Sequence, residues 1–197
     1  MDMGIEFELK YRANRQQQAA IRQAFSAEEE IYQMHTTYYD TPAGSFSARK
    51  CTLRRRMENQ RSVCTLKTPG GGHGRREWEV ECDSIEEAIE KLCKLGVPEE
   101  VLSLAKEGLI PICGARFTRI AKTLTCGQSV LELALDEGFL TGGDKQTPLC
   151  EVEVELKEGT QEDCLAFACQ LSESFGLQPE SGSKFRRALA LYKGETL

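Results

Sequence analysis

The stretch Ile5-Glu6-Phe7-Glu8-Leu9-Lys10-Tyr11 alternates apolar and charged side chains with a period of two residues. Successive side chains of an extended strand point to opposite faces, so this alternation predicts a β-strand with one apolar and one charged face. Glu6, Glu8 and Lys10 would share the charged face. The same alternation recurs along the chain, and it indicates a protein built mainly of such strands.

Outward from this stretch, the pattern predicts an α+β protein dominated by antiparallel strands. The further strands are expected at residues 34–40, 51–57, 61–68, 75–82, 114–126, 129–137 and 148–157. Helices are expected at residues 14–33, 85–95, 161–175 and 183–192, with a short helical piece after Pro98. Glu58-Asn59-Gln60 would join two strands as a hairpin. Because no repeat or linker interrupts the sequence, a single domain spanning residues 1–197 is expected.

The composition excludes several kinds of protein. The chain has 197 residues, with 25 Lys and Arg against 31 Asp and Glu, and a formal net charge of −6. This acidic balance argues against a nucleic-acid partner, which normally needs a basic surface. No apolar run approaches the roughly 18 residues of a membrane span. The acidic N-terminus lacks an apolar signal core, so a cytoplasmic protein without membrane contact is expected.

The metal-binding side chains available to the protein are mainly carboxylates. Only two histidines are present, and the nine cysteines include no C-x-x-C pair. Zinc or a disulfide framework is therefore poorly supported, and the cysteines are interpreted as reduced, mostly structural thiols.

Two predicted strands carry rows of carboxylates, one at positions 6 and 8 and one at positions 151, 153 and 155. Each row could be a solvated outer face. Like charges on adjacent strands repel, however, unless opposite charges intervene. The basic side chains at positions 54, 56, 67 and 75 would neutralise the rows only if all of them faced a common space. A barrel lined by both signs is one such geometry, and it could bind a divalent cation and a polyphosphate.

Nine short motifs resemble the CYTH superfamily, also called triphosphate tunnel metalloenzymes. In chain order they are Glu6-Phe7-Glu8-Leu9-Lys10, Tyr38-Tyr39-Asp40-Thr41, Leu53-Arg54-Arg55-Arg56, Thr65-Leu66-Lys67, Arg75-Arg76-Glu77-Trp78-Glu79, Phe117-Thr118-Arg119, residues 132–138 (ELALDEG), residues 150–156 (CEVEVEL) and Ser183-Lys184-Phe185-Arg186-Arg187. They cover nearly the whole chain, and the likeness is closest to the bacterial inorganic triphosphatases.

The resemblance implies a closed eight-stranded antiparallel β-barrel that forms a tunnel, with helices packed outside. It also implies hydrolysis of a triphosphate, with inorganic tripolyphosphate cleaved to pyrophosphate and phosphate, and with Mg²⁺ or Mn²⁺ as cofactor. The partner would be a small polyanionic substrate, and the oligomeric state stays open.

Site roles follow from these motifs together with the chemistry of a polyanion, which needs many Arg and Lys donors. The predicted phosphate-binding residues are Lys10, Arg54, Arg56, Lys67, Arg75, Arg119, Lys184 and Arg187. The predicted metal ligands are Glu6, Glu8, Asp136, Glu151, Glu153 and Glu155, since magnesium prefers oxygen ligands. The predicted catalytic residues are Glu6, Glu8, Lys10 and Glu153. Asp136 could instead hold basic residues in place, and a phosphate role for Lys122 is less secure.

Three alternatives remain open at this stage. The same tunnel could hydrolyse nucleotide or thiamine triphosphates, or act as an adenylate cyclase. It could also be a non-catalytic polyphosphate-binding module. An aromatic side chain that could stack on a thiamine ring is not evident, because Trp78 alternates away from Glu77 and Glu79 and should face the outer helices.

Overall fold

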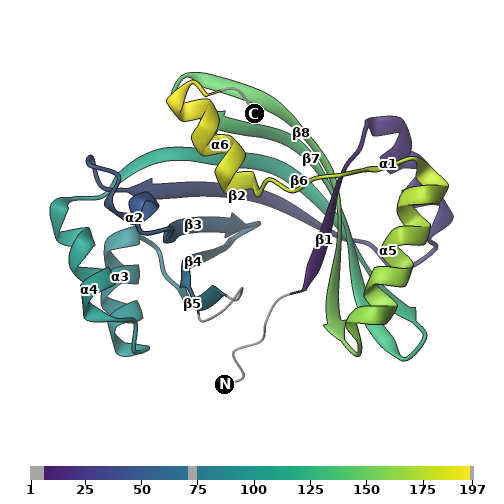
Figure 1. Cartoon of the computed structure of the whole chain (residues 1–197), viewed down its shortest axis with the longest axis horizontal. Coiled ribbons are helices and arrows are strands. Elements are labelled where there is room, and N and C mark those ends of the chain that lie inside the picture. Colours follow the sequence, from purple (N-terminus) through teal and green to yellow (C-terminus); the bar gives the residue numbers. More distant parts are fainter. Residues whose placement is uncertain (1–6, 71–74, 196–197) are drawn as a thin grey trace.

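The computed structural model describes residues 7–70 and 75–195. Within these residues, nine strands form one antiparallel sheet in the order β5-β4-β3-β2-β6-β7-β8-β1-β9 (Figure 1). The strands are β1 (Glu8–Arg12), β2 (Glu30–Asp40), β3 (Thr52–Glu58), β4 (Arg61–Pro69), β5 (Arg75–Glu81), β6 (Ile110–Cys126), β7 (Ser129–Gly142), β8 (Lys145–Glu158) and β9 (Gln178–Pro179). The helices are α1 (Arg15–Ala24), α2 (Ser45–Ala48), α3 (Ile85–Lys94), α4 (Glu99–Leu102), the 3₁₀ helix η1 (Ser103–Glu107), α5 (Gln161–Phe175) and α6 (Lys184–Lys193).

The predicted closed eight-stranded barrel is wrong, because the sheet is open and has nine strands. Over the described residues, the strand order runs from β5 at one edge to β9 at the other, and no pairing joins these edges. The outer edge of β1 is already occupied by β9, through the pairs Tyr11↔Pro179 and Arg12↔Gln178. The amide of Glu180 also donates to the carbonyl of Lys10 at 2.8 Å. This short ninth strand occupies backbone hydrogen-bonding groups on the free edge of β1. Closure of the sheet onto β5 would need the same groups.

The long strands β6, β7 and β8 arch over the molecule, so that β3–β5 and β1 lie on opposite sides of the arch (Figure 1). Close approach of β6 and β7 depends on Gly138, which lies opposite Phe117. A Cβ atom at position 138 would lie 2.1 Å from the carbonyl oxygen of Arg116 and 2.5 Å from the Cα of Phe117. Only glycine fits at this point of the D-x-G motif.

The alternation seen in the sequence separates the two faces of the sheet. On the outer face, Leu131, Leu133, Val152 and Val154 pack into an apolar cluster with helix α5. A second outer cluster joins β3 and β4 to the helices α3 and α4, and Trp78 packs against it as predicted. The charged members of the same strands therefore point to the inner, concave face.

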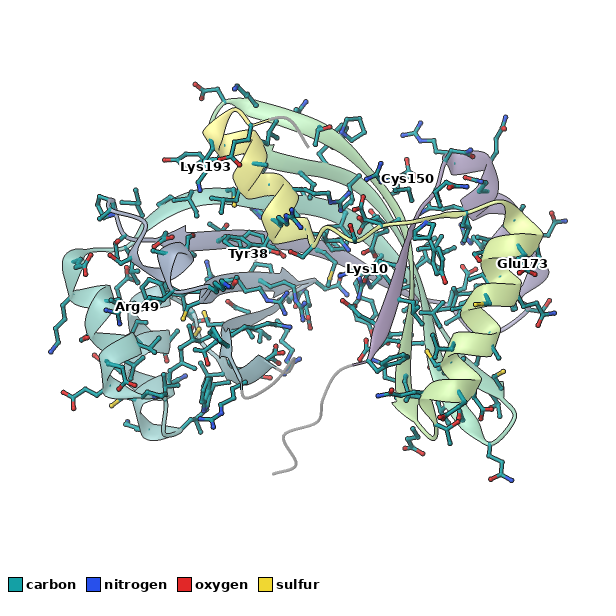
Figure 2. All side chains as sticks on the ribbon, viewed as in Figure 1. Lys10, Tyr38, Arg49, Cys150, Glu173 and Lys193 are labelled. Atoms are coloured by element: carbon teal, nitrogen blue, oxygen red, sulfur yellow. The ribbon has the colours of Figure 1, made fainter. Side chains whose placement is uncertain are left out.

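Helix α6 lies against β6 and β7 and covers one end of the concave face (Figure 1). Ala188 of this helix is buried with Tyr38, Phe117 and Leu140, and the rings of Tyr38 and Phe185 lie 4.8 Å apart. Figure 2 shows Tyr38 beneath α6 and Lys10 on β1. Ser183 caps this helix, since its hydroxyl accepts from the amide of Arg186 at 3.1 Å.

The predicted helix at residues 14–33 is wrong in its second half. Helix α1 ends at Ala24, and residues from Glu30 onward pair with β6, as in Ile31↔Ile120. Pairing with a long neighbouring strand overrides the helix propensity of the Glu-rich segment. In the described part of the chain, no helix is long and apolar enough to cross a membrane.

Candidate active site

Two adjoining cavities lie on the concave face. The α6 cavity, of about 310 Å³, lies next to helix α6 and is lined by Glu8, Lys10, Met34, Thr36, Tyr38, Thr52, Arg54, Arg56, Lys67, Phe117, Arg119, Glu153, Glu155, Ser183, Lys184 and Phe185. The distal cavity, of about 590 Å³, is lined by Tyr32, Met34, Arg54, Arg56, Glu58, Glu77, Glu79, Arg119, Glu132, Glu155, Leu156 and Lys157. They share Arg54, Arg56 and Arg119, so charged residues predicted from separate motifs line one continuous space.

Strand β3 supplies two arginines whose charge is incompletely neutralised. Arg54 and Arg56 alternate with Arg55 and so share the concave face. Their Nε atoms are buried and have no hydrogen-bond partner within the described residues. Burial and the neighbouring charge of Arg54 lower the pKa of Arg56. Buried donors without partners are costly, so this wall favours an anion that would accept from them.

Two lysines on the cavity wall lie within ion-pair distance of carboxylates. Lys10 Nζ lies 2.9 Å from Glu8 Oε1, and Lys67 Nζ lies 2.8 Å from Glu77 Oε2. These side chains are partly buried, with Lys10 18% and Lys67 20% exposed. Both lysines therefore lie in position to meet a ligand in the α6 cavity.

The opposite wall is organised around Lys184, the first residue of α6. Its Nζ lies 2.8 Å from Asp136 Oδ2, 2.7 Å from Glu151 Oε2 and 2.6 Å from Glu153 Oε1. Burial alone would lower the pKa of Lys184, but the charges of Asp136, Glu153 and Glu151 raise it. The lysine is therefore held charged inside a ring of three buried carboxylates, which we call the Lys184 cluster.

Arg119 of β6 completes the Lys184 cluster from the sheet. Its guanidinium binds Asp136 in a bidentate pair, with both distances at 2.7 Å, and also donates to Glu153. Burial would raise the pKa of Glu153, but Lys184 and Arg119 hold that pKa at about 2. Arg119 lies 5.8 Å and Lys184 5.2 Å from the ring centre of Phe117, which adds a cation–π contact.

Glu180 is a site residue that the sequence did not reveal. It is 6% exposed and accepts from Arg12 Nε at 2.6 Å, from the amide of Gly182 at 2.8 Å and from Arg187 Nη1 at 3.4 Å. Arg187 in turn pairs with Glu151 of the Lys184 cluster. Glu180 thus joins the edge of β1 to α6, and no periodicity could have signalled it because it lies in an irregular connection after a two-residue strand.

Two groups of carboxylates are candidates for holding a metal. Asp136, Glu151 and Glu153 offer oxygens within 4.8 Å of one another, but Lys184 lies among them and contacts all three. Glu8 and Glu155 face each other directly across β1 and β8, and both line the α6 cavity. Lys184 lies among all three carboxylates of the first group. In the second group Glu8 contacts Lys10 at 2.9 Å and Glu155 contacts Lys157 at 2.8 Å, but their side chains are 29% and 22% exposed and so offer oxygens to the cavity.

The structure brings most of the predicted site residues together. Lys10, Arg54, Arg56, Lys67, Arg119 and Lys184 line the α6 cavity, and Arg187 lies beside it through Glu151. Predicted residue Glu6 and the side chain of predicted residue Arg75 lie outside the described part of the chain.

Lys122, a further candidate for phosphate contact, lies on the opposite face of the sheet. It is 3% exposed, and its Nζ donates to the carbonyl of Arg22 at 2.9 Å and to that of Phe25 at 2.5 Å. Glu29 contacts the same ammonium at 3.0 Å. Lys122 therefore closes the C-terminal end of α1, where a cation complements the helix dipole.

Comparison with known proteins places this fold and site in a family. Residues 4–189 match the CYTH domain, so the chain belongs to the CYTH domain family.

An inorganic triphosphatase from Haemophilus influenzae is a relative in sequence, with 32% identity over 159 residues. The matched region is 79% of this chain and 45% of that protein, so the chain spans about half the length of the curated relative it matches.

Solved structures share the fold at lower identity. HpAC1 from Hippeastrum, for which a dominant triphosphatase activity is described, matches with a TM-score of 0.64 and 20% identity over 98% of this chain and 97% of that chain. The PH1819 protein from Pyrococcus horikoshii matches with a TM-score of 0.59 and 22% identity over 94% and 99%. At these identities the likeness shows the fold.

Proposed function

We propose that the concave face binds inorganic tripolyphosphate and hydrolyses it to pyrophosphate and phosphate with Mg²⁺ or Mn²⁺. The observation that carries this proposal is the pair of buried Nε donors on Arg54 and Arg56, which lack partners in the described chain and line the α6 cavity. The family membership and the inorganic triphosphatase relative support the substrate class.

The cations around the α6 cavity fit a short polyanion. Arg54 and Arg56 approach from β3, Lys67 from β4, Lys10 from β1 and Lys184 from α6. Charge-assisted hydrogen bonds from Arg and Lys to phosphate oxygens are stronger than neutral ones, and a fixed set of them orients the phosphate chain. Since tripolyphosphate has no ring or methyl group, these contacts supply its recognition.

Glu8 and Glu155 would hold the divalent metal, with Glu6 as a further predicted ligand. Hard carboxylate oxygens suit Mg²⁺ and Mn²⁺, and a bound metal would stabilise negative charge on the phosphoryl group during transfer. Asp136, Glu151 and Glu153 would instead position the cations of the Lys184 cluster, because their oxygens already contact Lys184 and Arg119.

The remaining chemistry needs no covalent intermediate. Water is the attacking group, and a cavity carboxylate on β1 or β8 could accept a hydrogen bond from it and orient it. Glu153 stays ionised at neutral pH, since its pKa is about 2, so its role is to hold Lys184 and Arg119 in place. These positioned cations stabilise charge that develops on the leaving pyrophosphate.

The test is phosphate release from tripolyphosphate with Mg²⁺, with Mn²⁺ and with a chelator. We expect release only with metal, and we expect the double variant Arg54→Ala/Arg56→Ala to lower kcat/KM at least a hundredfold. Arg55→Ala is the matched control, because Arg55 lies on the other face and donates to Ser62 Oγ at 2.9 Å. Equal or faster turnover of ATP would contradict the proposal.

The same assay separates hydrolysis from binding alone. If tripolyphosphate raised the melting temperature of the protein but no phosphate were released under any metal condition, the protein would be a polyphosphate-binding module. Formation of a cyclic nucleotide from ATP would instead indicate a cyclase.

A further inference from the structure

We infer that the distal cavity limits the length of the polyphosphate that the site accepts, because its carboxylates disfavour a chain longer than three phosphates. This inference rests on the proposed function, since it concerns the same space and the same class of substrate. It assigns specificity to residues with no part in binding the triphosphate itself, chiefly Glu79 and Glu132.

Charge is distributed unevenly along the two cavities. The charged residues found only in the α6 cavity are Glu8, Lys10, Lys67, Glu153 and Lys184. The charged residues shared by both cavities are Arg54, Arg56, Arg119 and Glu155. The charged residues found only in the distal cavity are Glu58, Glu77, Glu79, Glu132 and Lys157. The net charge of the lining therefore changes from positive near α6 to negative in the distal cavity, which has four carboxylates and one lysine of its own.

Apolar side chains lie at the α6 end of the α6 cavity. At the α6 end, the rings of Tyr38 and Phe185 lie 4.8 Å apart and Tyr38 is buried. An anion held by Arg54, Lys67 and Lys184 thus meets apolar side chains at that end. Further phosphate groups would extend more favourably into the distal cavity, which adjoins the α6 cavity at Arg54, Arg56 and Arg119.

The carboxylates of the distal cavity are accessible to such groups. Side-chain exposure is 17% for Glu58, 34% for Glu77 and 23% for Glu132. Because they are partly desolvated, their repulsion of a phosphate oxygen is stronger than it would be in bulk water. With three phosphates held by the cations of the α6 cavity, a fourth would lie against these carboxylates.

Glu79 and Glu132 are the residues that test this inference most cleanly. Glu79 accepts from Thr65 Oγ1 at 3.3 Å, and Glu132 lies 3.4 Å from Lys157. Glu132 also lies 4.0 Å from Arg119, whereas Glu77 and Glu58 are less suitable because they make closer contacts to Lys67 and Arg56. Glutamine at positions 79 and 132 removes the charge and keeps the shape and a hydrogen-bonding oxygen.

The matched control is the double variant Glu81→Gln/Glu137→Gln. It makes the same charge change on the same two strands, but outside both cavities. Glu81 pairs with Arg61 at 2.5 Å, and Glu137 pairs with Arg15 at 2.5 Å on the outer side.

Isothermal titration calorimetry measures the affinities for tripolyphosphate and tetrapolyphosphate without metal. Phosphate release from both is then measured with Mg²⁺. We expect the parent to prefer tripolyphosphate in both assays. We expect Glu79→Gln/Glu132→Gln to narrow this preference about fivefold to tenfold, with the control unchanged. Thermal melting of each variant confirms that the fold is intact.

The outcomes separate this inference from the proposed function. An equal preference in parent and double variant, or a parent that favours tetrapolyphosphate, overturns the inference even if tripolyphosphate is hydrolysed. A preference that narrows in the binding assay supports it even if no variant releases phosphate, and in that case the proposed hydrolysis fails. Tetrapolyphosphate binding that Mg²⁺ strengthens in the parent, but not in the double variant, would also overturn it, since the carboxylates would then recruit the longer chain through the metal.

Discussion

The two walls of the α6 cavity differ in how far their cations are paired with carboxylates. On the wall built by β6–β8 and α6, Lys184 and Arg119 are each surrounded by buried carboxylates. On the wall built by β3, the buried Nε donors of Arg54 and Arg56 have no hydrogen-bond partner among the described residues. The buried carboxylates neutralise Lys184 and Arg119 without a ligand, whereas the Nε donors of Arg54 and Arg56 would gain partners only when an anion binds.

This difference predicts which wall supports the fold and which supports binding. Breaking a buried ion pair leaves an uncompensated charge, so damage to the Lys184 cluster should lower stability strongly. Removing Arg54 or Arg56 relieves repulsion between their charges and also removes a ligand contact. Such a change should lower the affinity for the anion with little loss of stability.

Glu153→Ala should give the largest change in stability. It removes the carboxylate that contacts both Lys184 and Arg119, and the free energy of unfolding should fall by roughly 3–5 kcal/mol. Glu155→Ala on the same strand is the control, since Glu155 is 22% exposed and its ion pair should be worth at most about 1 kcal/mol. Urea unfolding measures both, and equal losses would contradict the comparison of the walls.

Acid should remove the stability that Glu153 contributes to the Lys184 cluster within a defined pH window. The folded pKa of Glu153 is about 2 against an ordinary value of 4.5, because the charges of Lys184 and Arg119 outweigh the effect of burial. A depressed folded pKa gives stability that is fully present above the ordinary value and is lost as the pH falls towards 2. The difference in melting temperature between the parent and Glu153→Gln should therefore be constant above about pH 5.5 and shrink below pH 4.5.

The comparison of melting temperatures between the parent and Glu153→Gln is needed because Glu29 titrates in the same pH range. Arg22 and Lys122 lower its pKa to about 2 as well. A difference that stayed constant down to pH 2.5 would argue against the assigned role of Glu153.

Arg54→Ala should change affinity rather than stability. The loss of charge-assisted contacts should weaken tripolyphosphate binding by roughly tenfold to a hundredfold, while the melting temperature without ligand stays the same or rises. Calorimetric titration and thermal melting report the two quantities. Lys184→Met provides the contrast, because it should lower both affinity and stability.

Lys122→Met should show the smallest effect on function. Its ammonium closes helix α1 on the outer face, so the free energy of unfolding should fall by roughly 1–3 kcal/mol from the unsatisfied carbonyls. Affinity for tripolyphosphate should remain within twofold of the parent. A loss of affinity comparable to that of Arg54→Ala would show that Lys122 reaches the ligand site.

Period-two alternation allowed most of the strands and the sharing of one charged face to be predicted. Leu9 and Tyr11 pack outward and Glu8 and Lys10 face the cavity because each strand buries its apolar face under helices. The same reasoning correctly separated Trp78 from the inner face.

What the sequence did not show depends on contacts between distant segments. The closed barrel was expected from the family resemblance and from rows of opposite charge facing a common space, but two residues at Gln178–Pro179 cover part of the β1 edge instead. Residues from Glu30 to Gln33 have a helix-like composition and pair with β6. Glu180 became visible only once β1 and α6 were brought together.

The most direct test of this account is a crystal structure of the protein with Mn²⁺ and a non-hydrolysable imido analogue of tripolyphosphate. We expect analogue oxygens within hydrogen-bond distance of the Nε atoms of Arg54 and Arg56, with the anomalous signal of Mn²⁺ at Glu8 and Glu155. An analogue bound outside the concave face, or Mn²⁺ that displaces Lys184 from Asp136, Glu151 and Glu153, would contradict it.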